Sequence, residues 1–130
     1  NQKCCIIRDP VSRFISAYKN RILYHKDLDF SNHSIDLIIE KLENKLFENL
    51  HFLPQSFFFG NDLSYFTIIG EINKINIFAN KINNFFGKVI NFPKIQTGGN
   101  KILLKLNNSQ IKKIKKIYSK DYNLISEFIK

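Results

Sequence analysis

Short apolar runs alternate with amphipathic segments along this chain. Residues 3–7 form an apolar run that predicts a strand, and residues 10–24 carry apolar side chains at helical spacing. Asp9 and Pro10 suit the start of that helix, because aspartate caps a helix N-terminus well and proline fits the first helical position. One face of the predicted helix is apolar, with Val11, Phe14, Ile15, Tyr18 and Ile22. The opposite face is polar, with Ser12, Arg13, Ser16, Lys19 and Asn20.

The middle of the chain predicts two more helices and a second strand. Apolar residues recur at helical spacing over 35–48 and over 73–86, and Gly87 suits a left-handed cap at the end of the second helix. An apolar run predicts the second strand over 65–69. The helix over 73–86 is expected to bury Ile75, Phe78, Ala79, Ile82, Phe85 and Phe86.

The last part of the chain predicts a basic helix. A short apolar piece at 89–92 is a candidate third strand, and a loop at 93–101 leads to a helix capped by Asn108 or Ser109. Strands that alternate with helices indicate an α/β fold, with a parallel sheet flanked by helices. Because no segment suggests a second unit, we expect a single domain over 1–130.

The formal net charge of +9 changes this picture little. Much of it comes from lysines on the solvated side of the last predicted helix, namely Lys112, Lys113, Lys115, Lys116 and Lys120. A merely soluble face is the simpler interpretation, and a surface that attracts polyanions is the alternative. No apolar stretch approaches the roughly 20 residues of a membrane span, so the chain as given is expected to be soluble.

Two adjacent cysteines, Cys4 and Cys5, fall in the first predicted strand. Their side chains should point to opposite faces of the sheet, so they cannot easily bridge to each other. We expect both to be core thiols. Neither has His or Asp at metal-ligand spacing, so no metal site is predicted.

Candidate chemistry gathers where the first strand meets the first helix. Arg8 ends the strand, at the edge where open α/β sheets bind anionic ligands with helix N-termini and arginine forks. Ser16 follows one turn after Arg13 on the polar face. Arg8 could instead pair with a carboxylate at the sheet edge, and Ser16 could bond back to a carbonyl of its own helix.

The pattern R-D-P-x-x-R-x-x-S-x-Y at 8–18 closely resembles the 3′-phosphate-binding segment of the carbohydrate sulfotransferases of sulfotransferase family 2. Members of that family transfer a sulfuryl group from 3′-phosphoadenosine 5′-phosphosulfate (PAPS) to a hydroxyl, usually on a sugar. The resemblance implies that Arg8 and Ser16 bind the 3′-phosphate. Arg13 is a further candidate for the same phosphate, with a surface salt bridge as its alternative. The implied fold is a partial P-loop-like nucleotide-binding fold, since two or three strands are too few for a complete one.

Three further segments agree with that family in order and spacing. The segment 51–55 resembles its H-x-x-P-Q motif, 66–71 its unit of strand, Gly, x, Glu and helix, and 117–122 its closing I-Y-x-x-D-Y helix. The likeness spans nearly all of the chain, although only the first segment is specific. Relatives cover the cofactor with a loop where this chain has Thr97 and Lys101, so both are candidate contacts. An ordinary glycine turn is the alternative there.

Members of the resembled family also carry an upstream loop, rich in Gly, Ser, Thr and Lys, that wraps the 5′-phosphosulfate. No such loop precedes Asn1, so residues 1–130 are expected to be the C-terminal portion of a sulfotransferase domain. The catalytic lysine and the general base belong to the upstream part, and the catalytic residues here stay unknown. His51 has the chemistry of a base, but the resemblance does not assign it that role, and a structural histidine is the simpler interpretation.

The function predicted from sequence is PAPS-dependent transfer of a sulfuryl group to a hydroxyl, with PAPS as co-substrate and a carbohydrate as acceptor. The alternative is a non-catalytic nucleotide- or polyanion-binding module. A basic nucleic-acid-binding domain is disfavoured, because the basic residues are not interleaved with aromatic ones. The oligomeric state is not indicated. The expected compartment is the cytoplasm for a bacterial source, or the Golgi lumen if the parent is a membrane-anchored eukaryotic enzyme.

Overall fold

The computed structural model describes residues 2–89, 91 and 102–129. Its strands are β1 (Cys4–Ile7) and β2 (Ile68–Glu71). Its α-helices are α1 (Pro10–Ala17), α2 (Ile35–Glu43), α3 (Gln55–Phe59), α4 (Ile75–Phe86), α5 (Asn108–Ile117) and α6 (Ser119–Ile125). A wider winding forms the π-helix η1 (Tyr18–Tyr24), and tighter turns form the 3₁₀ helices η2 (Leu63–Tyr65) and η3 (Ile72–Lys74).

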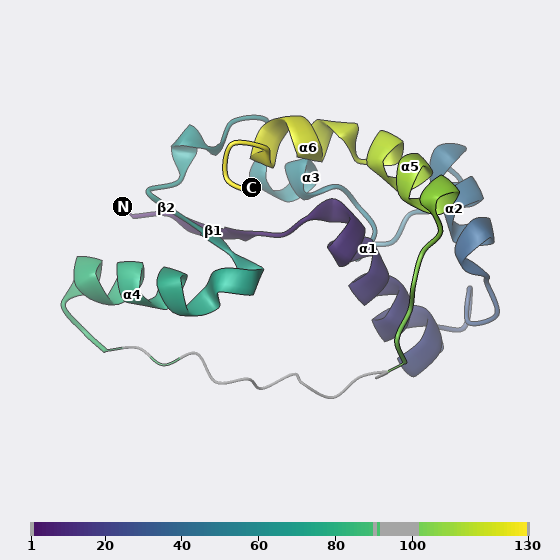
Figure 1. The fold of residues 1–130 in the computed structure, drawn as a ribbon, viewed down its shortest axis with the longest axis horizontal. Helices are drawn as coiled ribbons and strands as arrows, with labels where there is room; N and C mark the ends of the chain where they lie inside the picture. The colour runs from purple at the N-terminus through teal and green to yellow at the C-terminus, as the bar shows by residue number, and fades with distance from the viewer. Residues whose placement is uncertain (1, 90, 92–101, 130) are drawn as a thin grey trace.

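The two strands pair in parallel, in a register that places Cys4 opposite Ile68 and Ile7 opposite Glu71. Figure 1 shows α4 on one side of the strands and α3 with α6 on the other. The predicted parallel sheet flanked by helices is therefore confirmed. The second strand begins at Ile68, later than predicted, because the Asp62 side chain caps a 3₁₀ turn over the preceding residues.

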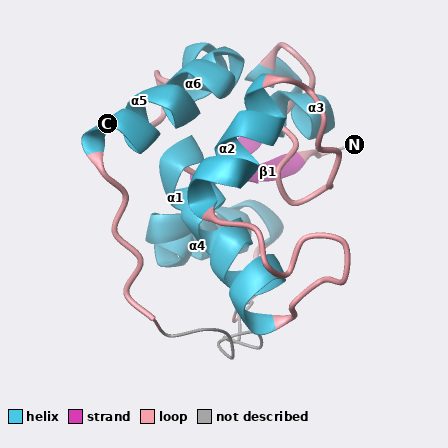
Figure 2. Cartoon of the chain, turned by 90° about the vertical axis from the view of Figure 1, so that its right-hand side faces the viewer, coloured by secondary structure: helices cyan, strands magenta, loops and turns pink. Residues whose placement is uncertain are grey.

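Apolar side chains form a large cluster between α1, η1, α2 and α5, and a smaller one between the sheet and α6. Figure 2 views the side of the molecule where α1, α2 and α5 are grouped. The large cluster includes Phe14, Ile22, Ile38, Phe52 and Ile114. The smaller cluster includes Cys5, Ile7, Leu63 and Ile125. Burial on both sides of the β1–α1 junction holds the end of the first strand rigidly in place.

The predicted helix over 10–24 changes its winding midway. α1 ends at Ala17 and continues as the π-helix η1, so the His25 N–H donates to the Asn20 carbonyl five residues back, at 2.9 Å. Arg21, within η1, donates from Nε and Nη2 to the carboxylate of Asp27, which lies beyond the helix, each at 2.8 Å. π-helical turns are rare and frequently occur at functional sites. Here η1 forms a wall of the cleft described below.

Two helix boundaries differ from the predictions. α2 ends at Glu43 and not at 48, because Lys45 adopts a left-handed backbone conformation with φ 55°. The last basic segment is capped by Asn107, so the expected cap at Asn108 or Ser109 is wrong. Asn107 Oδ1 accepts from the Gln110 N–H at 2.8 Å and Gln110 Oε1 accepts from the Asn107 N–H at 3.0 Å, which completes a capping box.

The helix α4 confirms the left-handed cap at Gly87, which has φ 65°. Of its predicted buried face, Phe78 is buried and Ile75, Ala79 and Ile82 are half-buried. The prediction is wrong for Phe85 and Phe86, which are 47% and 49% exposed. The helix meets β2 where Gly70 leaves room for Phe78, and its outer turns extend past the short sheet. The sequence predicts a candidate third strand at 89–92. Residues 89 and 91 lie in no strand, and residues 90 and 92 are outside the described residues.

The two cysteines lie on opposite faces, as predicted, and neither forms a disulfide. Cys5 is buried, and burial raises the pKa of its thiol to about 11. Cys4 is exposed, so the expectation of two core thiols is wrong for Cys4. The reason is that α4 packs mainly against β2, where Phe78 meets Gly70, and does not cover Cys4 at the start of β1.

Replacing Gly70 with alanine is expected to lower the free energy of unfolding by about 1–3 kcal/mol. An added Cβ would lie 2.3 Å from Phe78 Cδ2 and 2.7 Å from Phe78 Cβ, so β2 and α4 would have to separate. Urea denaturation measures the change. Gly87→Ala is the control, because no described residue lies within 4 Å of its added Cβ and only the backbone strain of a left-handed residue, roughly 1–2 kcal/mol, applies. A Gly70→Ala loss no larger than that of Gly87→Ala would contradict this packing argument.

Candidate functional site

Arg8 is the first residue after β1, and the side chain of Gln55 binds its backbone. Its N–H donates to Gln55 Oε1 at 2.9 Å, and its carbonyl accepts from Gln55 Nε2 at 2.7 Å. The Arg8 Nε is buried and, among the described residues, has no hydrogen-bond partner. Burial, followed by the nearby Arg13 charge, lowers the pKa of Arg8, while Asp9 opposes the shift.

Asp9 acts as the predicted helix cap. Its Oδ2 accepts from the Ser12 N–H at 2.9 Å, and Pro10 occupies the first helical position. The other carboxylate oxygen, Oδ1, accepts from the Tyr122 hydroxyl at 3.0 Å. Asp9 is therefore engaged by α1 and α6. Among the described residues no salt bridge joins Arg8 to a carboxylate, so the alternative that the sequence left open for Arg8 is not observed.

A cleft of about 930 Å³ opens beside Arg8. It runs along α1 and η1 and across to the segment before α3, and it is lined by Arg8, Arg13, Ser16, Ala17, Asn20, Arg21, Tyr24, His25, Leu50 and His51. The structure thus brings together three of the predicted site residues, Arg8, Arg13 and Ser16. None of the described residues that line the cleft carries a carboxylate. The lining is suited to an anion.

Arg13 and Ser16 differ in how they are engaged. Arg13 Nη1 donates to the Leu53 carbonyl, and burial is the main cause that lowers the pKa of Arg13. Within the described part of the chain it forms no salt bridge, so that alternative is not observed. The Ser16 hydroxyl makes no hydrogen bond to another described residue, so it is not bonded back to its helix.

His51 lines the cleft opposite α1 and is exposed. Burial of its ring, followed by the charge of Arg21, lowers the pKa of His51 below the ordinary 6.5. Thr97 and Lys101, the other two candidate contacts, lie outside the described residues.

Several residues of the site escaped the sequence analysis. Arg21, Tyr24 and His25 line the cleft from η1 and its C-cap. The helical spacing that places Asn20 on the polar face, where it also lines the cleft, could have found Tyr24 as well. Gln55 and Asp121 lie behind the site in contacts between segments far apart in sequence. The motifs at 51–55 and 117–122 singled out these segments, but sequence alone gave them no role.

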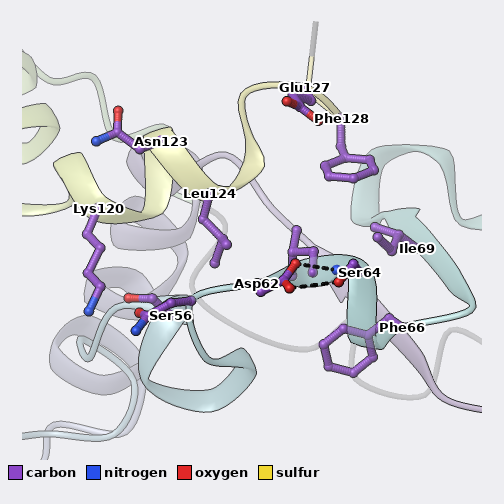
Figure 3. A pocket seen from close by; sticks show the side chains of 12 residues that line it. Ser56, Asp62, Ser64, Phe66, Ile69, Lys120, Asn123, Leu124, Glu127 and Phe128 are labelled. Atoms are coloured by element: carbon purple, nitrogen blue, oxygen red, sulfur yellow. Dashed lines mark hydrogen bonds between the residues drawn. The ribbon is translucent and has the colours of Figure 1, made fainter.

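A second pocket, of about 500 Å³, lies between α6 and the segment around η2. Figure 3 shows Leu124, Phe66 and Phe128 beside it, with Lys120 and Asn123 on α6. Asp62 accepts from the Ser64 N–H at 2.8 Å and from its hydroxyl at 2.7 Å, so this carboxylate is already engaged. None of the described residues predicted for the site, Arg8, Arg13 and Ser16, lines this pocket.

The described residues contain neither a candidate metal centre nor a membrane-spanning helix. No group of three or more His, Cys, Asp or Glu residues among them could hold a metal ion. No helix in the described ranges has the length and apolar character needed to cross a membrane.

The fold and the cleft define a mixed α/β protein with a basic cleft at the end of a parallel strand. A sequence model of the sulfotransferase family matches residues 2–125, nearly the whole chain, and the chain belongs to that family, sulfotransferase family 2. No curated protein and no solved structure matches the chain. Membership of the family supports a transferase activity that moves a sulfuryl group.

Proposed function

We propose that this chain binds the 3′-phosphate of PAPS through Arg8 and Ser16, and so positions the donor for sulfuryl transfer to a carbohydrate hydroxyl. The observation that carries the proposal is the buried Nε of Arg8, which has no partner among the described residues, in a cleft whose described lining carries no acidic side chain. A buried donor without a partner costs about 1–3 kcal/mol, and native proteins rarely leave one. A phosphate oxygen that meets Nε once the Arg8 side chain turns toward the cleft would remove that cost.

The geometry of α1 supports the same assignment. Ser16 lies on the helix that begins right after Arg8, and its hydroxyl has no other bond to a described residue. Arg13 shares the cleft, so its charge adds to the positive potential that Arg8 meets. Two positive side chains and a hydroxyl suit a doubly charged phosphate monoester.

Binding at the 3′-phosphate contributes to transfer at the other end of the nucleotide. When bound, PAPS supplies the sulfuryl group, and negative charge develops on the leaving phosphate oxygen during transfer. Arg8 and Ser16 hold a remote group, and such binding energy orients the reacting atoms. We infer that the catalytic lysine and base come from other parts of a P-loop-like domain of which this chain is the C-terminal portion.

Thermal stabilisation at fixed salt tests the proposal. 3′,5′-Adenosine bisphosphate should raise the melting temperature more than 5′-adenosine monophosphate at equal concentration, because only the bisphosphate carries the 3′-phosphate. Equal shifts from the two nucleotides would contradict it.

The alternative function is a polyanion-binding surface without turnover. It is supported by exposed lysines on α5, among them Lys112, Lys113, Lys115 and Lys116. Binding through such a surface would fall steeply with salt for any polyanion, because each neutralised phosphate releases counterions. A heparin or DNA affinity that exceeds that for the bisphosphate, with such a salt dependence, would favour this alternative.

Saturating 3′,5′-adenosine bisphosphate is expected to raise the pKa of His51. In the free protein that pKa lies below 6.5, since burial and neighbouring cations disfavour the imidazolium. An anion bound in the same cleft stabilises the charged form and reverses part of the shift. NMR titration of the histidine ring protons measures both values. A titration curve of His51 that the bisphosphate leaves unchanged would place the ligand elsewhere.

A further inference from the structure

Gln55 takes the place of a neighbouring strand for Arg8. β2 ends at Glu71, which pairs with Ile7, so the ladder stops one residue before Arg8. A side-chain amide has the same donor and acceptor as a peptide group. Gln55 uses both on the backbone of Arg8, at 2.9 Å and 2.7 Å, and is itself only 4% exposed. The arginine backbone is thus fixed beyond the end of the sheet.

Gln55 is fixed in turn by α6. Its own N–H donates to Asp121 Oδ2 at 2.7 Å, and the Ser56 N–H donates to Asp121 Oδ1 at 2.9 Å. Asp121 is 0% exposed, so solvent does not compete for these bonds. A continuous chain of hydrogen bonds therefore links α6, the start of α3 and Arg8.

The segment before Gln55 is tied down as well. The Tyr118 hydroxyl donates to the Phe52 carbonyl at 2.6 Å, and Arg13 Nη1 donates to the Leu53 carbonyl. Arg13 faces the same cleft as Arg8. One segment thus orients two arginines, one through its Gln55 side chain and one through its backbone.

The geometry points to Gln55 as a positioning residue that orients Arg8 for the 3′-phosphate, with Asp121 as its anchor. This inference rests on the proposed function. A fixed backbone sets the direction in which the arginine side chain leaves it, so less freedom is lost when the phosphate binds. The selectivity for a 3′-phosphate, and not nucleotide binding in general, should therefore depend on Gln55.

The test compares dissociation constants for 3′,5′-adenosine bisphosphate and 5′-adenosine monophosphate, measured by calorimetry at one salt concentration. In Gln55→Ala the preference for the bisphosphate should fall on the order of tenfold, because small displacements of a positioning group cost up to about 10²-fold. The affinity for the monophosphate should not change. A purely structural role would lower the melting temperature and leave the ratio of the two constants intact.

Gln110→Ala is the matched control. Gln110 also donates one side-chain bond, to Asp36 Oδ1 at 2.9 Å, and accepts one, from the Asn107 N–H at 3.0 Å, but it lies on α5 outside the cleft. Its loss should leave the ratio unchanged.

Gln55→Met keeps the size of the side chain, adds no charge and removes both bonds to the Arg8 backbone, so it gives the same test if Gln55→Ala does not fold. A folded Gln55 variant with the wild-type preference would overturn the inference while the proposed function stands. A wild-type protein without any preference would instead overturn the proposed function, and this inference with it.

Discussion

Replacing Arg8 with alanine is expected to weaken binding of 3′,5′-adenosine bisphosphate by roughly 10- to 150-fold. Hydrogen bonds to charged groups contribute about 1.5–3 kcal/mol, and each 1.4 kcal/mol is a factor of ten in affinity. The buried Nε of Arg8 has no competing partner among the described residues, so the whole interaction is available to the phosphate. Binding of 5′-adenosine monophosphate should change little. Isothermal titration calorimetry gives both constants.

Two variants separate a specific contact from loss of positive charge. Lys112→Ala removes one charge from the exposed side of α5, away from the cleft, and should leave the affinity nearly unchanged. Arg8→Lys keeps the charge but loses the planar fork, so it should recover part of the binding at most. Equal losses in Lys112→Ala and Arg8→Ala would show that net charge, not Arg8, attracts the nucleotide.

Replacing Asp121 with alanine is expected to lower the free energy of unfolding by about 3–6 kcal/mol. Its carboxylate is fully buried and accepts two backbone N–H groups at the start of α3, at 2.7 Å and 2.9 Å. Each such bond to a charged acceptor is worth about 1.5–3 kcal/mol, and alanine would leave both donors buried without a partner. Denaturant unfolding measures the loss.

Asp62→Ala is the control for Asp121→Ala. Asp62 also accepts two hydrogen bonds, both from Ser64, at 2.8 Å and 2.7 Å, but it lies at the surface. Water can replace its carboxylate there, so the unfolding midpoint should move far less. Similar midpoints for the two variants would show that the buried bonds of Asp121 contribute little.

Elements with strong local signals could be predicted from the sequence. The start of α1 follows from Asp9 and Pro10, whose capping depends only on neighbouring residues, and the structure has both in the predicted roles. The end of α4 follows from Gly87 for the same reason. The phosphate-site hypothesis began from this local pattern too, because Arg8 and Ser16 are only two helical turns apart.

Features that depend on distant contacts could not be predicted. Gln55 meets Arg8 across 47 positions and Asp121 across 66, and no periodicity carries such information. The change from α1 to the π-helix η1 is equally invisible in the pattern, since both windings bury Tyr18 and Ile22. For α4, the helical periodicity predicts which side of the helix is apolar, but not how far the sheet beneath it extends. The prediction that Phe85 and Phe86 are buried is wrong for that reason.

The central claim is that the cleft beside Arg8 recognises a phosphate at the 3′ position. Its most direct test is calorimetry of the wild-type chain with two isomers, 3′,5′- and 2′,5′-adenosine bisphosphate, at the same salt concentration. The isomers carry equal charge and the same base, so they differ only in where the second phosphate sits. We predict that the 3′,5′ isomer binds at least about tenfold more tightly, since a displaced phosphate cannot meet Arg8 and Ser16 together. Equal affinity for the two isomers would contradict the claim.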